Sequence, residues 1–236
     1  MFVLIENQRL KFNSGIKMSK FIISLANESH INFVDFICLT MAESAAQRGT
    51  GIAKRSPEYI ATKMREGKAI IALNKKGEFG GFCYIETWGQ GKYVANSGLI
   101  VNPTYRHHGL ARRIKETAFK LSRKKYPEAQ IIGLTTSLAV MKINSDLGYY
   151  PVTFSELTND GAFWTGCQSC VNYDILKGKD FKNCLCTGML YNPKDNKKSR
   201  KWNFIKKSKI YERLVRMKRA VFTKDSKFSI LNLFSI

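Results

Sequence analysis

The chain has 236 residues, 44% of them hydrophobic, which is enough to bury a full core and excludes a peptide or a disordered tail. A formal net charge of +21 favours polyanionic partners such as nucleic acid, an anionic membrane or the phosphates of a nucleotide cofactor. No run approaches the roughly 18 to 20 apolar residues that span a bilayer, and the N-terminus lacks the apolar block of a cleavable signal. A cytoplasmic location is therefore predicted.

The sequence divides into three parts. Residues 1–17 are either an appended arm or a stretch upstream of an alternative start at Met18. Residues 18–193 are the predicted domain, with a cysteine-bearing insertion at about 157–186. Residues 194–236 are basic, with fourteen Lys or Arg against three acidic residues, and contain a predicted amphipathic helix at 210–222. The cationic face of that helix suits an anionic membrane or RNA, although docking on the domain is at least as well supported.

The first third of the chain predicts a strand at 21–23 and two helices. The first helix starts after Asn27, and the second starts near Ser56, which can cap it, with Pro57 in its first turn. A glycine-rich loop between them carries three cations, Arg48, Lys54 and Arg55. These cations either hold the carboxylates of a substrate or belong to a solvated basic loop.

The middle of the chain predicts a hairpin of buried strands, 68–73 and 80–88, followed by a strand that begins near Tyr93 and runs to about Val101. A helix follows, and residues 130–136 are the next strand. Because a helix connects these last two strands, they should run parallel. Residues 137–146 predict another helix and residues 150–154 another strand.

The stretch from Ala95 to Tyr126 organises the rest of the chain. An apolar strand ends at Asn102-Pro103, and a short basic loop leads into a helix whose apolar residues recur at helical spacing. The first N–H groups of that helix are unpaired and its dipole is positive there, so the backbone from His107 to Ala111 can bind a pyrophosphate. Gly109 allows the close approach of phosphate.

The hexapeptide Arg106-His107-His108-Gly109-Leu110-Ala111 resembles the acyl-CoA signature of the GNAT N-acyltransferase superfamily, and residues from about 20 to 191 follow that family's element order. The resemblance implies an α/β (α+β) fold with a mixed central sheet, splayed parallel strands and flanking helices. It also implies acetyl-CoA or another acyl-CoA as cosubstrate. The residues expected to bind it are Leu99, Ile100, Val101, Arg106, His107, His108, Gly109, Leu110, Ala111, Arg112 and Thr135.

Acyl transfer to an amine needs a base, a polarised carbonyl and a proton for the leaving thiolate. Glu86 is the candidate base, near a strand end beside Asn96 and Ser97, with a solvated glutamate as the alternative. The family often places an acidic Tyr where this chain has Asn144, which can stabilise a thiolate or orient water but cannot act as an acid. Tyr149 is one candidate to replace it, and a domain that binds acyl-CoA without efficient turnover stays open.

Four of the six cysteines form two close pairs, Cys167 with Cys170 and Cys184 with Cys186. In a cytoplasmic chain this pairing is compatible with a structural zinc site, with buried thiols that bind no metal, or, less favoured, with redox chemistry. The surrounding insertion contains Phe163 and Trp164, for which core packing is favoured over a lid on the substrate.

The acceptor is predicted from the loop that contains Arg48, Lys54 and Arg55, with Asn96 and Ser97 as further substrate-binding candidates. The loop and the cysteine-bearing insertion resemble a bacterial subgroup that acylates amino acids in arginine biosynthesis. This implies an anionic small-molecule amine such as glutamate as acceptor and acetyl or succinyl as the transferred group. Alternatives are a protein or polyamine acetyltransferase, and an RNA- or membrane-binding protein on a degenerate scaffold. A homodimer is possible.

Overall fold

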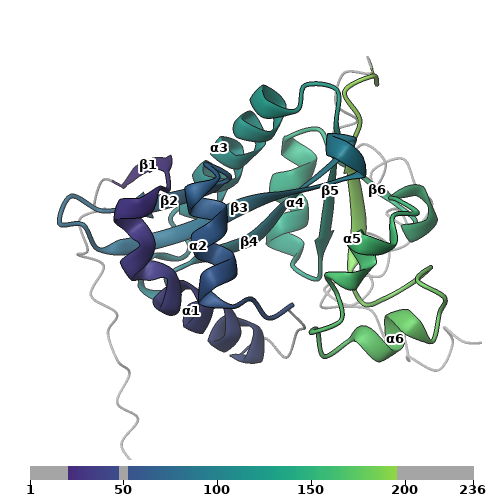
Figure 1. Ribbon diagram of the computed structural model, residues 1–236, viewed down its shortest axis with the longest axis horizontal. Helices are drawn as coiled ribbons and strands as arrows, with labels where there is room; N and C mark the ends of the chain where they lie inside the picture. Colours follow the sequence, from purple (N-terminus) through teal and green to yellow (C-terminus); the bar gives the residue numbers. More distant parts are fainter. Residues whose placement is uncertain (1–20, 48–52, 196–236) are drawn as a thin grey trace, which may run out of the picture. The chain divides into compact units, whose positions relative to one another are not determined.

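The structure is a computed structural model that describes residues 21–47 and 53–195. Seven strands form a mixed sheet in the order β1-β2-β3-β4-β5-β7-β6 (Figure 1). None of the helices in these described ranges is long and apolar enough to cross a membrane. By their internal contacts the described residues separate into two compact units. The first comprises those up to Glu86 together with Asn96–Leu121, and the second comprises Thr87–Ala95 and those from Ser122 onward.

The described residues of the first unit form the N-terminal half of the sheet and the helices that cover it. Its elements are β1 (Ile22–Leu25), α1 (Val34–Gln47), α2 (Pro57–Arg65), β2 (Ala69–Leu73), most of β3 (Phe79–Trp88), the end of β4 (Tyr93–Val101) and most of α3 (Leu110–Lys125), with short 3-10 helices at Glu28–Phe33 and Pro103–Tyr105. The strands β1, β2 and β3 pair antiparallel in chain order. The helix α2 begins where the sequence predicts, because the Ser56 side chain caps the backbone N–H of Tyr59 and Pro57 occupies the first turn.

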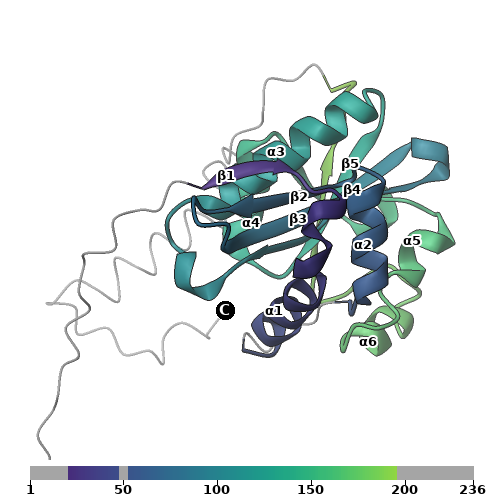
Figure 2. The same cartoon turned by 60° about the vertical axis from the view of Figure 1, so that its left-hand side comes forward.

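Both faces of β2 and of the first part of β3 are covered, which explains why these segments are apolar, whereas β1 at the edge of the sheet is mostly exposed. The helices α1 and α2 pack on one face through residues such as Ile37 and Ile60, and α3 packs on the other through Leu110, Ile114 and Ala118 (Figures 1 and 2). Adjacent residues of β3 therefore serve different layers: Tyr84 belongs to the α1–α2 core and Cys83 to the α3 core.

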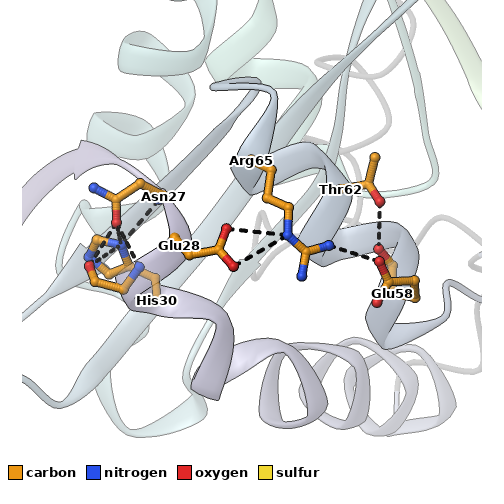
Figure 3. A network of polar contacts seen from close by, with 7 residues as sticks. Asn27, Glu28, His30, Glu58, Thr62 and Arg65 are labelled. Atoms are coloured by element: carbon orange, nitrogen blue, oxygen red, sulfur yellow. Dashed lines mark hydrogen bonds and ion pairs between the residues drawn. The ribbon is translucent and has the colours of Figure 1, made fainter.

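An exposed arginine connects α2 to the segment that precedes α1. Arg65 lies 3.2 Å from a carboxylate oxygen of Glu28 and 2.8 Å from one of Glu58, seven residues earlier in the chain (Figure 3). Its side chain is 43% exposed, and those of Glu28 and Glu58 are 73% and 76% exposed. The network is therefore a solvated surface contact.

The second unit contains the C-terminal strands and the insertion. Its elements are β5 (Gln130–Thr135), α4 (Leu138–Asp146), β6 (Tyr150–Val152), α5 (Gly161–Thr165), α6 (Tyr173–Lys177) and β7 (Thr187–Tyr191), with 3-10 helices at Gly89–Gly91 and Phe154–Glu156. The start of β4 pairs parallel with β5, Tyr93–Ala95 against Gln130–Ile132, which confirms the predicted direction. The strand β7 returns antiparallel between β5 and β6.

The insertion packs its aromatic residues into a core that it shares with Ile132 of β5 and Leu190 of β7. Phe163 and Trp164 are 6% and 7% exposed and contact Phe154, Leu157 and Leu176 in one cluster. The indole N–H of Trp164 donates to the carbonyl of Thr158 at 3.0 Å. This confirms core packing for the two aromatic residues.

Candidate active site

The loop between β4 and α3 has the open geometry that phosphate binding requires. His107 and Gly109 both have left-handed backbone, with φ of 66° and 76°. His107, His108 and Gly109 are exposed, and a Cβ built on Gly109 would have nothing within 4 Å. The first turn of α3 follows directly, with Arg113 N–H bonded to the carbonyl of Gly109 at 3.2 Å. The loop can therefore present backbone N–H groups to an anion without a side chain in the way.

Arg106 holds this loop in place from the inside. Its Nε donates to the carbonyl of Val101 at 3.2 Å, and its Nη2 donates to the hydroxyl of Ser44 in α1 at 2.6 Å. Ser44 is 1% exposed, so the guanidinium points into the protein. These two hydrogen bonds fix the Arg106 side chain against β4 and α1, and its contact with the cofactor stays a prediction.

The other residues predicted to bind acyl-CoA differ in how far their side chains are buried. Ile100, Val101 and Leu110 are buried in the core, and Leu99 and Ala111 pack partly against it. The buried side chains of Ile100, Val101 and Leu110 leave only their backbone to face a ligand. Thr135 lies in the second unit, where its hydroxyl accepts from the N–H of Ser137 at 3.0 Å.

A buried polar cluster lies on the α1–α2 face of β3. The Nε of Arg55 donates to the hydroxyl of Tyr84 at 2.8 Å, and its Nη1 donates to the carbonyl of Lys54 at 3.1 Å. Its Nη2 lies 4.0 Å from a carboxylate oxygen of Glu86. The side chains of Arg55 and Glu86 are only 17% and 12% exposed. Two of the sequence candidates, Arg55 and Glu86, are thus brought together.

The environment of Glu86 suits a proton acceptor. Burial raises the pKa of its carboxyl above the ordinary value, while the charge of Arg55 and a hydrogen bond from Ser97 oppose that rise. The pKa of Tyr84 is also raised by burial, against the opposing effect of Arg55. A carboxylate with an elevated pKa beside a cation is the arrangement expected of a general base.

Ser97 lies at an irregularity of β4. The next residue, Gly98, has φ of 62° within the strand, and a Cβ there would approach the ring of Tyr84 to 2.4 Å. No other residue type fits that position without displacing the ring. The carbonyls of Asn96 and Ser97 both accept from buried groups, the Nζ of Lys115 at 3.5 Å and the Sγ of Cys83 at 3.4 Å.

Tyr84, Lys115 and Gly98 also lie in or beside this part of β4, and the sequence did not predict them as site residues. Tyr84 was detectable, because it lies two residues before Glu86 and strand alternation puts both on one face. Lys115 is one of several Lys and Arg residues in its helix, and no sequence pattern distinguishes it as the buried one.

Asn144 and Tyr149, the candidates for the leaving-group role, are buried in the second unit. Asn144 is 1% exposed, with its Nδ2 3.6 Å from the sulfur of Met189 and its Oδ1 without a hydrogen-bond partner within the described part of the chain. Tyr149 is 2% exposed and its ring lies 6.0 Å from that of Tyr191. Neither environment is that of a solvent-accessible acid, so their catalytic role stays a prediction.

The four paired cysteines gather around one small cavity of about 30 Å³ in the insertion. Burial first, then the neighbouring sulfurs, raises the pKa of Cys186 to about 12, which keeps it a neutral thiol. Within the described residues, however, no group of three or more Cys, His, Asp or Glu side chains is placed to hold a metal ion. The structural zinc site predicted for Cys167, Cys170, Cys184 and Cys186 is therefore not supported, although their clustering is real.

A second cavity of about 410 Å³ lies in the same insertion, lined by residues that include Phe154, Trp164 and Phe181. Its walls combine aromatic with neutral polar side chains, and its charged members are Asp180 and Lys182. The one carboxylate among its lining residues, that of Asp180, is exposed, unlike that of Glu86.

Several predicted features lie outside the described residues. These are Arg48, the arm of residues 1–17 and all but the first two residues of the basic extension. Lys54 is described and its carbonyl accepts from Arg55. The nucleic acid, membrane and homodimer partners stay predictions.

Comparison with known proteins identifies the fold. No protein-family model matches the sequence, and no curated protein matches it. Among solved structures, N-acetylglutamate synthase from Neisseria gonorrhoeae with coenzyme A and N-acetyl-glutamate superposes with a TM-score of 0.53 at 14% identity, over 75% of this chain and 36% of that one. The chain thus spans about a third of that synthase.

Two shorter proteins match over nearly their whole length. Rv2747 from Mycobacterium tuberculosis, in complex with CoA, gives a TM-score of 0.52 at 14% identity, over 72% of this chain and 98% of that one. An acetyltransferase of the GNAT family from Staphylococcus aureus gives 0.52 at 12% identity, over 74% and 100%. The chain has the GNAT acetyltransferase fold, which confirms the predicted fold class.

Proposed function

We propose that this protein is an acyl-CoA-dependent N-acyltransferase that moves an acetyl or succinyl group to the amine of an anionic amino acid such as glutamate. The observation that carries the proposal is the presence, in one compact unit, of an open phosphate loop at the start of α3 and a buried Arg55–Glu86 pair on β3. The GNAT fold, found in proteins solved with coenzyme A, supports the donor.

The residues of the loop fit the donor. The exposed N–H groups from His107 onward, at the positive end of α3, would hold the pyrophosphate, and Gly109 leaves room for it. The pantetheine arm would run along the backbone of β4 after Ala95, where the parallel pairing with β5 ends. The core side chains of Leu99, Ile100 and Val101 would hold that strand edge in place.

In the reaction, a bond forms between the amine nitrogen and the thioester carbon, and the bond from that carbon to sulfur breaks. Glu86 would accept the proton that the amine loses, directly or through a water. The elevated pKa makes the carboxylate a stronger base than an exposed glutamate. The departing thiolate takes its proton from water or from a group outside this cluster.

Arg55 would set the choice of acceptor. Its Nη2 faces Glu86 at 4.0 Å, a distance too long for a tight ion pair, so a further carboxylate can approach the same guanidinium. A cationic acceptor would instead be repelled by Arg55 and by neighbouring Lys63, whose Nζ lies 4.8 Å from the ring of Tyr59. Arg55 and Lys63 together thus favour dicarboxylic amino acids over spermidine or lysine peptides.

A panel of acceptors tests the proposal. Free thiol released from acetyl-CoA and from succinyl-CoA is measured with glutamate, aspartate, lysine, a lysine peptide and spermidine. We expect the highest kcat/KM with a dicarboxylic amino acid. Faster transfer to spermidine or lysine would overturn the acceptor assignment, and no release above hydrolysis with any amine would overturn the enzymatic function itself.

A further inference from the structure

Lys115 is a buried cation that the proposed chemistry does not yet use. Its side chain is 2% exposed and lies on the sheet side of α3, among the apolar residues Ile114 and Ala118. Lysines are rarely buried, because taking an ammonium out of water is costly. Burial lowers its pKa from 10.5 to about 8. The thiol of Cys83 on β3 acts against this shift.

The ammonium of Lys115 is aimed at the backbone of β4. Its Nζ lies 3.5 Å from the carbonyl oxygen of Asn96, a long hydrogen bond in which the attraction of a charge for a dipole persists. Cys83, which is fully buried, donates from Sγ to the next carbonyl, that of Ser97, at 3.4 Å. Two successive carbonyls thus accept from one buried pair, next to the left-handed Gly98 that breaks the strand's regularity.

The peptide group transmits this charge to the other side of the strand. No peptide bond in the described chain is cis, so the N–H of Ser97 points opposite to the carbonyl of Asn96. A cation at the oxygen end holds the peptide in one orientation and polarises it, which makes the Ser97 N–H a stronger donor. The side chain of the same Ser97 bonds to Glu86, the proposed base.

We propose that Lys115 is a positioning residue for acyl transfer, which acts through the Asn96–Ser97 peptide group so that the N–H of Ser97 can stabilise the negative charge that develops on the thioester carbonyl. This inference rests on the proposed function, since it concerns the strand beside Glu86. A preorganised backbone donor of this kind is effective because it needs no reorganisation during the reaction.

The test compares Lys115→Met with Lys120→Met, which removes a cation from an exposed position of the same helix. The first readout is the amide proton shift of Ser97 by NMR as a function of pH, which needs no turnover. We expect a titration with a midpoint of about 8 in the unchanged protein and in Lys120→Met, and none in Lys115→Met. Lys115→Gln serves as a second neutral variant if the Met side chain prevents folding.

The second readout is steady-state transfer to the best acceptor. We expect Lys115→Met to lower kcat by about tenfold, since the donor is weakened but not removed, with KM for acyl-CoA little changed. An unchanged Ser97 titration, or an unchanged kcat in a folded variant, overturns the role of Lys115. Absence of transfer in the unchanged protein overturns the proposed function, whereas the Ser97 titration alone decides whether Lys115 acts on the peptide.

Discussion

Two arginines ten residues apart each face carboxylates, and their surroundings differ sharply. Arg65 bridges Glu28 and Glu58 at the surface, where all three side chains are more than 40% exposed (Figure 3). Arg55 faces Glu86 and the hydroxyl of Tyr84 where the two charged side chains are less than 20% exposed. An arginine–glutamate contact is thus solvated at Arg65 and largely buried at Arg55.

This difference in solvent exposure indicates which of the two contacts is suited to a catalytic role. Water screens the charges at Arg65, whose pKa is raised mainly by its hydrogen bond to Glu58, and such exposed pairs contribute little. Around Glu86 the screening is weak, so burial raises its pKa against the opposing cation. A group that is costly to bury and incompletely neutralised is a candidate for function.

The largest expected effect is on Glu86. Glu86→Gln keeps the shape but removes the base, so kcat should fall about 10²- to 10⁴-fold, with Glu58→Gln in the surface network as the unaffected control. Because the pKa of Glu86 is raised, kcat/KM of the unchanged enzyme should decline as pH falls through a midpoint above 4.5, and the variant should lose this limb. An unaltered acid limb in Glu86→Gln would assign the base to another group.

The same carboxyl predicts how stability depends on pH. A carboxyl whose pKa is higher in the folded than in the unfolded state binds more protons when folded. The stability it contributes is therefore present at low pH and is lost as pH rises from about 4.5 through the raised value. Denaturant unfolding of the unchanged protein and of Glu86→Gln across this range provides the measurement, and Glu58→Gln is again the control.

The next largest effect is expected at Gly109, where the backbone rather than a charged side chain is proposed to bind the ligand. Gly109→Glu puts bulk and negative charge where the phosphates must lie, so Kd for coenzyme A measured by calorimetry should rise about a hundredfold or more. Gly77→Glu is the matched control, because Gly77 also has positive φ, 79° against 76°, and an equally open surrounding. If both variants bind equally well, the loop does not hold the phosphates.

Arg55 comes third. Removing its charge-assisted bond to an acceptor carboxylate costs roughly 1.5 to 3 kcal/mol, so Arg55→Ala should raise KM for glutamate by about ten- to a hundredfold while KM for acyl-CoA changes little. The acid limb of kcat/KM should also move to higher pH, because Arg55 opposes the rise in the pKa of Glu86. An equal rise in both KM values would make Arg55 a structural residue.

Local patterns were predictable from the sequence, and long-range pairings were less so. The strand, loop and helix around Gly109 follow from apolar spacing and turn chemistry, and the parallel direction of β5 follows from its helical connection. The partners of Arg106, which are Ser44 and Val101, and the burial of Lys115 depend on tertiary packing that no local pattern encodes. The cysteine spacing correctly suggested a cluster but not whether its geometry could hold a metal.

The smallest expected effect is on Arg65, and it completes the comparison. Arg65→Ala removes a cation from two carboxylates that water already solvates, so Tm should fall by at most a few degrees, and by less in high salt. Turnover and both KM values should be unchanged. Calorimetry at low and high salt, together with the acceptor assay used for Arg55→Ala, provides the measurement. If Arg65→Ala impaired glutamate transfer as strongly as Arg55→Ala, burial would not be what separates the two arginines, and a general effect of positive charge on the acceptor would explain both results.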